Sequence, residues 1–343
     1  MKMTEHIINV ERVEQEIALF GSLDENIKAI EKHFGVTIVN REGNIKISSE
    51  NEEMAFKAKR AIEELLKLIT KGEELTPQMV NYVLALVASS EENKLKDMGK
   101  GVVCVTARGK VIKAKTVGQQ RYLDEISRKT IVLGIGPAGT GKTYLAVAQA
   151  VAAFRDKKVN KIILTRPAVE AGEKLGFLPG DLQNKVDPYL RPLYDALFDM
   201  MGAESYQNYF EKGNIEVAPL AYMRGRTLDD SFIILDEAQN TTPEQMKMFL
   251  TRMGFNSKVV ITGDITQTDL PDGKTSGLRV AMNVLKDIDD IGIVHLTAAD
   301  VVRHELVQKI IMAYEKYEKN AAERAKEKKK YFKKDIKKDV KNG

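Results

Sequence analysis

Residues 131–154 hold the feature that constrains the fold most strongly. The apolar run IVLGI (131–135) is followed by the glycine-rich segment GPAGTGKT (136–143) and then by TYLAVAQAVAAF, an apolar stretch that favours a helix. Glycines let the backbone curl so that successive N–H groups point at one anion, and the N-terminus of the next helix adds positive charge. A strand, this loop and a helix in that order predict a phosphate-binding P-loop on an α/β fold.

The residues of this loop suit the binding of a nucleoside triphosphate. Lys142 can reach the β- and γ-phosphates, and the Thr143 hydroxyl can bind Mg²⁺. The segment that would hold the phosphates of ATP comprises Gly136, Pro137, Ala138, Gly139, Thr140, Gly141, Lys142 and Thr143. The competing interpretation is a glycine turn without a ligand, which the flanking strand and helix disfavour.

Two later apolar runs also end in polar residues. SFIILDEAQ (231–239) ends in Asp236, which is placed to hold Mg²⁺, and Glu237, which is suited to polarise an attacking water. These carboxylates could instead cap the following helix.

KVVITGDITQ (258–267) ends in a polar turn, where Gln267 could contact the γ-phosphate or its water. Gly-Asp alone indicates only a turn. Together with the other two motifs, it favours an ATPase in which one extra strand lies between the P-loop strand and the acidic strand.

The segment TVGQQRY (116–122) could recognise the base of the nucleotide. It favours a short helix, and the Gln119 side chain could pair with the adenine edge. The Tyr122 ring could stack on the base. Without a family resemblance, ordinary polar residues on a helix surface are the better interpretation.

Hydrolysis also needs a positive group near the charge that develops on the γ-phosphate, often an arginine of a neighbouring subunit. The candidates are Arg166, Arg224, Arg226 and Arg303, of which Arg303 opens the last expected helix. We take Arg303 as the catalytic candidate. A single arginine more often forms a surface salt bridge, and the sequence does not distinguish among the four. His304 is a weaker candidate, because a lone histidine at a helix start usually faces solvent.

Short apolar runs alternate with helical segments from about residue 113 onwards, which predicts a parallel sheet covered by helices on both faces. The runs expected to form its strands are 131–135, 161–165, 215–219, 232–236, 258–262 and 291–296.

The first part of the chain predicts a separate small α/β unit over residues 4–69. Residues 36–49 are typical of a β-hairpin, and residues 76–88 of a helix with Thr76 as its N-cap. A polar break and a second hairpin, expected over residues 102–116 with a turn at Arg108-Gly109, separate this unit from the larger sheet.

Charge is unevenly distributed along the 343 residues, whose formal net charge is +4. Residues 315–343 carry twelve Lys or Arg against six Asp or Glu, so residues 1–314 have a net charge of −2. We expect this Lys-rich tail to be a frayed or solvated terminus, with salt-sensitive attraction to phosphates as the alternative. No apolar run approaches the about 20 residues that a membrane helix needs, and the single Cys104 suits a reducing, cytoplasmic setting.

Residues from about 115 to 317 resemble the PhoH family of cytoplasmic P-loop ATPases, which is close to the superfamily 1 helicase core. The resemblance rests on TVGQQRY, GIGPAGTGKT, LTRPAVEAGEKLGFLPGDLQNKVDPYLRPLYDAL, MRGRT, FIILDEAQNTT, ITGDITQTDLP and DVVRHELV. It implies ATP binding and hydrolysis, hexameric rings and a link to RNA metabolism. In some bacteria, the implied partner is an endoribonuclease that acts in ribosomal RNA maturation.

The N-terminal unit resembles a KH-type RNA-binding module, which clamps nucleotides with a GXXG loop. Here the corresponding residues, Gly21-Ser22-Leu23-Asp24, keep only the first glycine, and the acidic Asp24 and Glu25 would repel phosphates. A structural or oligomerisation role therefore competes equally with weak RNA binding. The expected domains are a KH-like domain (1–90), a linker and hairpin (91–114), the ATPase domain (115–317) and the tail (318–343).

Residues 165–193 are expected to form a long loop punctuated by proline and glycine, which either contacts RNA or another subunit. Thr165 and Arg166 lie where helicase-like proteins touch the nucleic-acid backbone. Two other functions compete with an RNA-coupled ATPase: a P-loop kinase that phosphorylates a small molecule, and an ATP-gated scaffold without motor activity. Only one P-loop core is visible, so strand separation is not expected of a single chain.

Overall fold

The computed structural model describes residues 3–314, except 11, 42–43, 74, 93–94, 96–100, 168–181, 272, 304–305, 308–309 and 311–312. The chain divides into two compact units, Met1–Val301 and Val302–Gly343. The Lys-rich tail, His304 and the centre of the 165–193 segment lie outside the described residues. No helix among those described is both long and apolar enough to cross a membrane.

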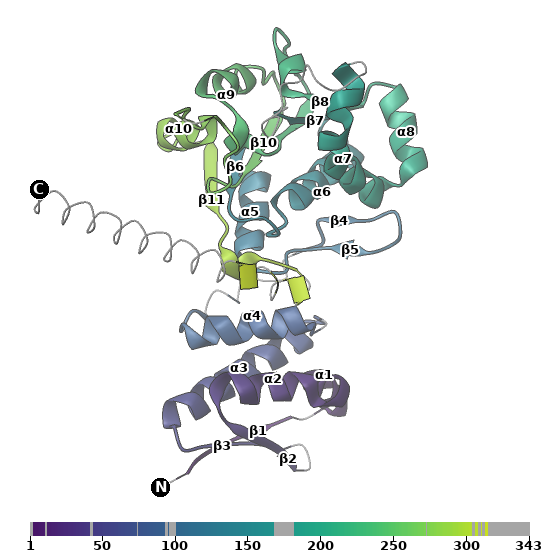
Figure 1. Cartoon of the computed structure of the whole chain (residues 1–343). Coiled ribbons are helices and arrows are strands. Elements are labelled where there is room, and N and C mark those ends of the chain that lie inside the picture. The colour runs from purple at the N-terminus through teal and green to yellow at the C-terminus, as the bar shows by residue number, and fades with distance from the viewer. Residues whose placement is uncertain are drawn as a thin grey trace, which may run out of the picture. The chain divides into compact units, whose positions relative to one another are not determined.

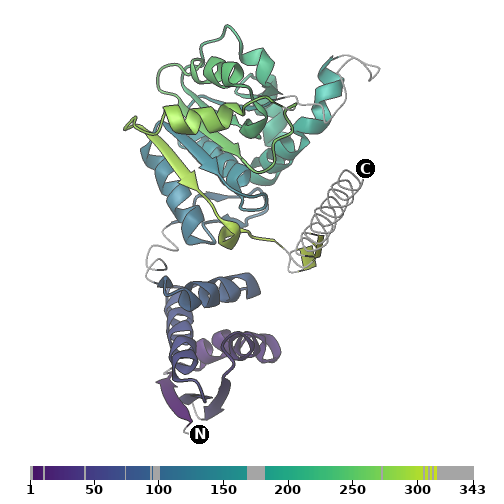
Figure 2. The same cartoon turned by 60° about the vertical axis from the view of Figure 1, so that its left-hand side comes forward.

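Six parallel strands form the main sheet, in the order β11-β6-β10-β9-β7-β8. Their bounds are Ile131–Ile135 (β6), Lys161–Arg166 (β7), Ile215–Pro219 (β8), Ser231–Leu235 (β9), Lys258–Gly263 (β10) and Ile291–His295 (β11). Figure 2 shows β11, in yellow-green, at one edge of this sheet. All six predicted strands are therefore confirmed, and β10 lies between the P-loop strand and the acidic strand as expected.

Helices cover both faces of the sheet (Figure 1), because alternate strand residues point to opposite sides. The bounds of the helices are Val117–Arg128 (α5), Lys142–Arg155 (α6), Leu182–Met201 (α7), Ala203–Glu211 (α8), Pro243–Leu250 (α9) and Gly277–Val284 (α10). Phe232 and Ile234 pack into one core with α5, α6 and α7, whereas Ile233 and Leu235 pack into another with α9 and α10. Short 3₁₀ turns span Leu220–Met223 (η3), Ala238–Asn240 (η4) and Ala298–Asp300 (η5).

One part of the expected 165–193 loop is helical. Helix α7 begins at Leu182 and contains Pro188 and Pro192. Proline in a helix interior removes a backbone hydrogen bond, which is why these residues favour a loop in the sequence. Leu193 and Leu197 of the same helix are fully buried in the core that covers this face of the sheet, and this packing offsets the local penalty.

The N-terminal residues form a second sheet with a hydrophobic core of its own. Its antiparallel strands have the order β1-β3-β2. The elements are Thr4–Asn9 (β1), Val13–Phe20 (α1), Ser22–Asp24 (η1), Glu25–Phe34 (α2), Thr37–Arg41 (β2), Asn44–Ser49 (β3), Glu52–Thr70 (α3) and Pro77–Ala88 (α4). The segment Gly21–Asp24 joins α1 to α2, and the KH-like assignment stays a prediction.

Threonine hydroxyls cap two helix starts. The Thr76 hydroxyl accepts a hydrogen bond from the Met79 N–H, as predicted for α4. Thr116, which was not predicted as a cap, accepts from the Gln119 N–H at the start of α5. The second hairpin is also present, with short antiparallel strands at Cys104–Val105 (β4) and Val111–Ile112 (β5). The predicted domain boundaries stay predictions.

Candidate nucleotide-binding site

The P-loop connects the carboxyl end of β6 to the start of α6. Gly139 and Gly141 have φ values of 88° and 77°, in the left-handed region that glycine tolerates. A side chain at Gly136 would collide with the carbonyl oxygen of Leu296, so this position also requires glycine. The Gly136 N–H donates to the Gly263 carbonyl (3.1 Å), which joins the loop to the end of β10.

Lys142 points back into the curve of the loop. Its Nζ donates to the carbonyl oxygens of Gly136 (2.6 Å) and Pro137 (2.9 Å). The ammonium group is therefore held inside the ring of backbone that is expected to surround a phosphate. This is the position from which a P-loop lysine reaches the β- and γ-phosphates.

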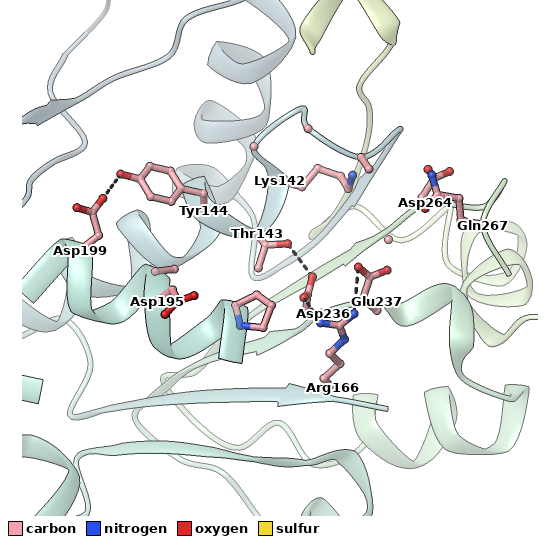
Figure 3. A pocket seen from close by; sticks show the side chains of 16 residues that line it. Lys142, Thr143, Tyr144, Arg166, Asp195, Asp199, Asp236, Glu237, Asp264 and Gln267 are labelled. Carbon is pink, nitrogen blue, oxygen red and sulfur yellow. Dashed lines mark hydrogen bonds and ion pairs between the residues drawn. The ribbon is translucent and has the colours of Figure 1, made fainter. Parts of the chain in front are cut away.

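Asp236 follows β9 and is 5 % exposed. Its Oδ1 accepts hydrogen bonds from the Thr143 hydroxyl (2.6 Å) and the Thr262 hydroxyl (2.7 Å). The two metal-binding candidates of the sequence, Thr143 and Asp236, are thus in direct contact (Figure 3). One hydroxyl and one carboxylate suit Mg²⁺, which keeps several waters and takes its other ligands from phosphates. Among the described residues, no three His, Cys, Asp or Glu side chains converge as a protein-only metal site.

Glu237 has a φ of 52°, a left-handed conformation that is uncommon for a residue other than glycine. Its carboxylate accepts a hydrogen bond from the Gln239 amide (2.5 Å) and lies 3.4 Å from the Arg166 guanidinium. Arg166 also lies 4.0 Å from Asp236 and donates to the Tyr189 carbonyl of α7 (3.0 Å). Unusual backbone geometry that the surroundings hold in place is typical of functional sites.

One cavity of about 660 Å³ brings together Lys142, Thr143, Arg166, Asp236 and Glu237. Its walls come from the P-loop, the ends of β7, β9 and β10, and the facing side of α7 (Figure 3). The charged residues that line it are two cations, Lys142 and Arg166, and five acids: Asp195, Asp199, Asp236, Glu237 and Asp264. Gln267, predicted to contact the γ-phosphate, lines the same cavity.

The two residues assigned to the base are buried beneath the P-loop instead. Tyr122 is 0 % exposed, its hydroxyl donates to the Lys142 carbonyl (3.3 Å), and its ring fills the space where Gly134 lacks a side chain. Burial raises the pKa of this phenol, and the negative charge of Asp236 adds to the effect. A ring in this position supports the loop and offers no exposed face for stacking in this structure, and the assignment of Tyr122 to the base stays a prediction.

Gln119 is buried in the same region. It is 3 % exposed, its amide oxygen accepts from the Lys115 N–H (2.8 Å), and its amide nitrogen donates to the Thr140 carbonyl (3.0 Å). Both ends of the amide are thus bonded to the main chain, and one of them supports the P-loop. The contact of Gln119 with the adenine edge stays a prediction.

The structure separates the four candidate arginines. Arg166 lines the cavity, whereas Arg226 forms a two-bond ion pair with Glu216 (2.6 and 2.7 Å) and Arg224 is exposed. Arg303 belongs to the second compact unit, so its catalytic role stays a prediction. Thr165, expected beside a nucleic-acid backbone, is 0 % exposed, and burial excludes that contact in this structure.

The sequence did not indicate the roles of several residues in and around the cavity. Asp264 lines the cavity, whereas Thr262 and Gln239 bond to residues that line it. All three occur in the quoted motifs, yet their roles depend on which strands are neighbours. The Gln239 amide links the Glu237 side chain to the Asp264 N–H (3.0 Å), which no spacing in the sequence indicates. On the opposite wall, the Tyr144 hydroxyl donates to Asp199 (2.6 Å), so a residue of α6 contacts one of α7.

Comparisons with known proteins agree with this geometry. A family model described as PhoH-like protein matches residues 111–315. The PhoH-like protein of Mycobacterium bovis (strain ATCC BAA-935 / AF2122/97) is 56 % identical over 304 residues, which cover 88 % of this chain and 86 % of that protein. The PhoH-like protein of Bacillus subtilis (strain 168) is 52 % identical over 318 residues, 92 % of this chain and 99 % of that protein.

Protein PhoH of Escherichia coli (strain K12) is 48 % identical over 206 residues, which cover 59 % of this chain and 58 % of that protein. The match to the family spans the phosphate-binding loop, the acidic strand and Gln267, and the relatives at 52–56 % identity extend it over most of the chain. The chain therefore belongs to the family of PhoH-like proteins, and is an ATP-binding protein of the PhoH type.

Proposed function

We propose that this protein hydrolyses ATP to ADP and inorganic phosphate and that it uses Mg²⁺. The observation that carries the proposal is the contact between Thr143 of the P-loop and Asp236 of the acidic strand, with Glu237 on the same cavity. Thr143 and Asp236 would hold Mg²⁺, which when bound neutralises charge on the phosphates.

The residues of this chain have distinct tasks in that reaction. The main chain of the P-loop and Lys142 bind the β- and γ-phosphates, while Glu237 accepts a proton from the attacking water. Arg166, which lines the cavity beside both carboxylates, is placed to stabilise the charge that develops on the γ-phosphate. Because Arg166 comes from the same chain, basal turnover does not require an arginine of a neighbouring subunit.

A small-molecule kinase is the competing function, and the identity of the product distinguishes the two. ATP with Mg²⁺ should yield inorganic phosphate at the rate at which ADP appears, with no added acceptor. ADP that forms only in the presence of a small molecule, together with its phosphorylated form, would establish the kinase instead. An ATP-gated scaffold would bind nucleotide and release neither product.

We further propose that hydrolysis is coupled to RNA in the cytoplasm, in RNA remodelling or in ribosomal RNA processing with an endoribonuclease, and that the protein assembles into hexameric rings. The family resemblance supports these proposals. The net charge of −2 over residues 1–314 argues against a broad positive surface, so local groups and the Lys-rich tail would carry RNA contacts. ATP turnover with and without single-stranded RNA, together with the mass of the protein in solution, tests the coupling and the assembly.

A further inference from the structure

Asp264 is a buried acid with one oxygen that lacks a partner. The residue follows β10, lines the cavity and is 5 % exposed. Its Oδ1 accepts from the Thr266 N–H (2.9 Å) and the Thr266 hydroxyl (2.6 Å), whereas Oδ2 is buried without a hydrogen-bond partner among the described residues. A buried polar atom without a partner is costly, and in native proteins it commonly indicates a bound water or ligand.

The position of Asp264 relative to Glu237 is fixed by a single side chain. Gln239 donates to the Glu237 carboxylate (2.5 Å) and accepts from the Asp264 N–H (3.0 Å). A side chain at Gly263 would lie 2.8 Å from the Gln239 oxygen, so glycine at this position allows the approach. Glu237 and Asp264, which follow the neighbouring strands β9 and β10, are thereby held beside the same cavity (Figure 3).

The chemistry of the unpaired oxygen determines what it can bind. An ionised carboxylate accepts hydrogen bonds and donates none, so Oδ2 suits a water proton and repels a phosphate oxygen. A water that attacks phosphorus must direct a lone pair at the γ-phosphate, which leaves its two protons for two acceptors. Glu237 provides one acceptor, and Asp264 lines the same cavity with an oxygen that lacks a partner among the described residues.

We propose that Asp264 Oδ2 orients the attacking water together with Glu237, a role that rests on the proposed ATP hydrolysis. The water oxygen forms a bond to the γ-phosphorus while the bond from that phosphorus to the β–γ bridging oxygen breaks, and its electron pair leaves with ADP. One water proton passes to Glu237. The other stays on the new phosphate oxygen and is held by Asp264 until the product leaves.

The experiment compares two phosphate mimics on Asp264→Asn, which keeps the size of the side chain but places an amide at one oxygen position. ADP with beryllium fluoride resembles bound ATP, whereas ADP with aluminium fluoride resembles the transition state with its oriented water. We expect Asp264→Asn to keep beryllium fluoride trapping within about threefold, to lose aluminium fluoride trapping and to turn over about 10²–10³-fold more slowly. Asp264→Ser, which is smaller, gives the same readout if the amide prevents folding.

The matched control is Asp269→Asn, an exposed acid of the same loop that contacts Asn240 and does not line the cavity. It should behave like the wild type in all three measurements. Wild-type turnover and trapping by Asp264→Asn would overturn the inference, and so would an equal loss of both mimics, because that result indicates support of the site's shape. A wild-type protein that neither hydrolyses ATP nor traps ADP with aluminium fluoride would refute the proposed function itself.

Discussion

Thr262→Val removes one of the two hydroxyls that hold Asp236 and leaves the shape of the side chain almost unchanged. Thr262 is 0 % exposed, and its hydroxyl lies 2.7 Å from Asp236 Oδ1. With Mg²⁺ bound as proposed, the Thr143 hydroxyl would serve the metal, and Thr262 would remain as the donor that orients the carboxylate. The substitution should therefore act on both stability and metal affinity.

The magnitudes follow from that geometry. A buried hydrogen bond to a charged group contributes about 1.5–3 kcal/mol, so the free energy of unfolding should fall by about that amount. The Tm should fall by about 2–4 °C for each kcal/mol. Partners that orient a metal ligand typically contribute 10–100-fold to metal affinity, so the Mg²⁺ concentration for half-maximal ATP turnover should rise about tenfold or more.

The assay is a Mg²⁺ titration of ATP turnover alongside thermal unfolding. Thr251→Val is the control, because Thr251 is an exposed threonine whose hydroxyl bonds to the main chain of α9. It should leave the Mg²⁺ dependence unchanged. If Thr262→Val kept the wild-type Mg²⁺ dependence and the wild-type Tm, the Thr262 hydroxyl would be excluded as the group that orients Asp236.

Three further predictions test other parts of the site. Glu237→Gln should bind ATP with near wild-type affinity but turn it over about 10²–10⁴-fold more slowly, since the amide accepts no proton; normal single-turnover hydrolysis would exclude Glu237 as the base. Arg166→Ala should lower ATP turnover by about 10³-fold or more at every protein concentration. The control Arg226→Ala, which breaks the ion pair with Glu216, should leave turnover unchanged. If Arg166→Ala kept the wild-type rate, the arginine that stabilises the γ-phosphate charge would be Arg303 or one from another subunit. If the Lys-rich tail carries RNA contacts, as proposed, deletion of residues 315–343 should weaken RNA binding at low salt and spare basal ATP hydrolysis. Unchanged RNA affinity would instead identify the tail as the solvated terminus that the sequence predicts.

The sequence predicted the main sheet because each strand is a short apolar run that ends in a polar or glycine-rich turn. Buried parallel strands have apolar residues on both faces, so they appear in the sequence as continuous apolar runs such as IVLGI. Helix α1 was not predicted, since eight residues with two glutamates give too short a pattern. The start of α7 was missed for a different reason: Pro188 and Pro192 oppose a helix locally, and tertiary packing outweighs them.

The burial of the residues assigned to the base could have been predicted from the sequence. Gln119, Tyr122 and Ile126 recur at helical spacing with Leu123, and this face of α5 is buried. The same spacing in the sequence would have indicated an inward-facing row. Thr262 could not be assigned in this way, because its contact with Asp236 depends on the pairing of β10 with β9, where Ile261 lies opposite Leu235. Neighbouring strands, not sequence spacing, bring these two side chains together.

Product analysis on the purified protein tests whether ATP is hydrolysed at the P-loop. With Mg²⁺ and no phosphate acceptor, the wild type should release ADP and inorganic phosphate in equal amounts. Lys142→Ala should release neither, because the β- and γ-phosphates lose the cation that the loop holds at Gly136 and Pro137. Wild-type protein that forms no inorganic phosphate, or Lys142→Ala that forms it at the wild-type rate, would contradict the account.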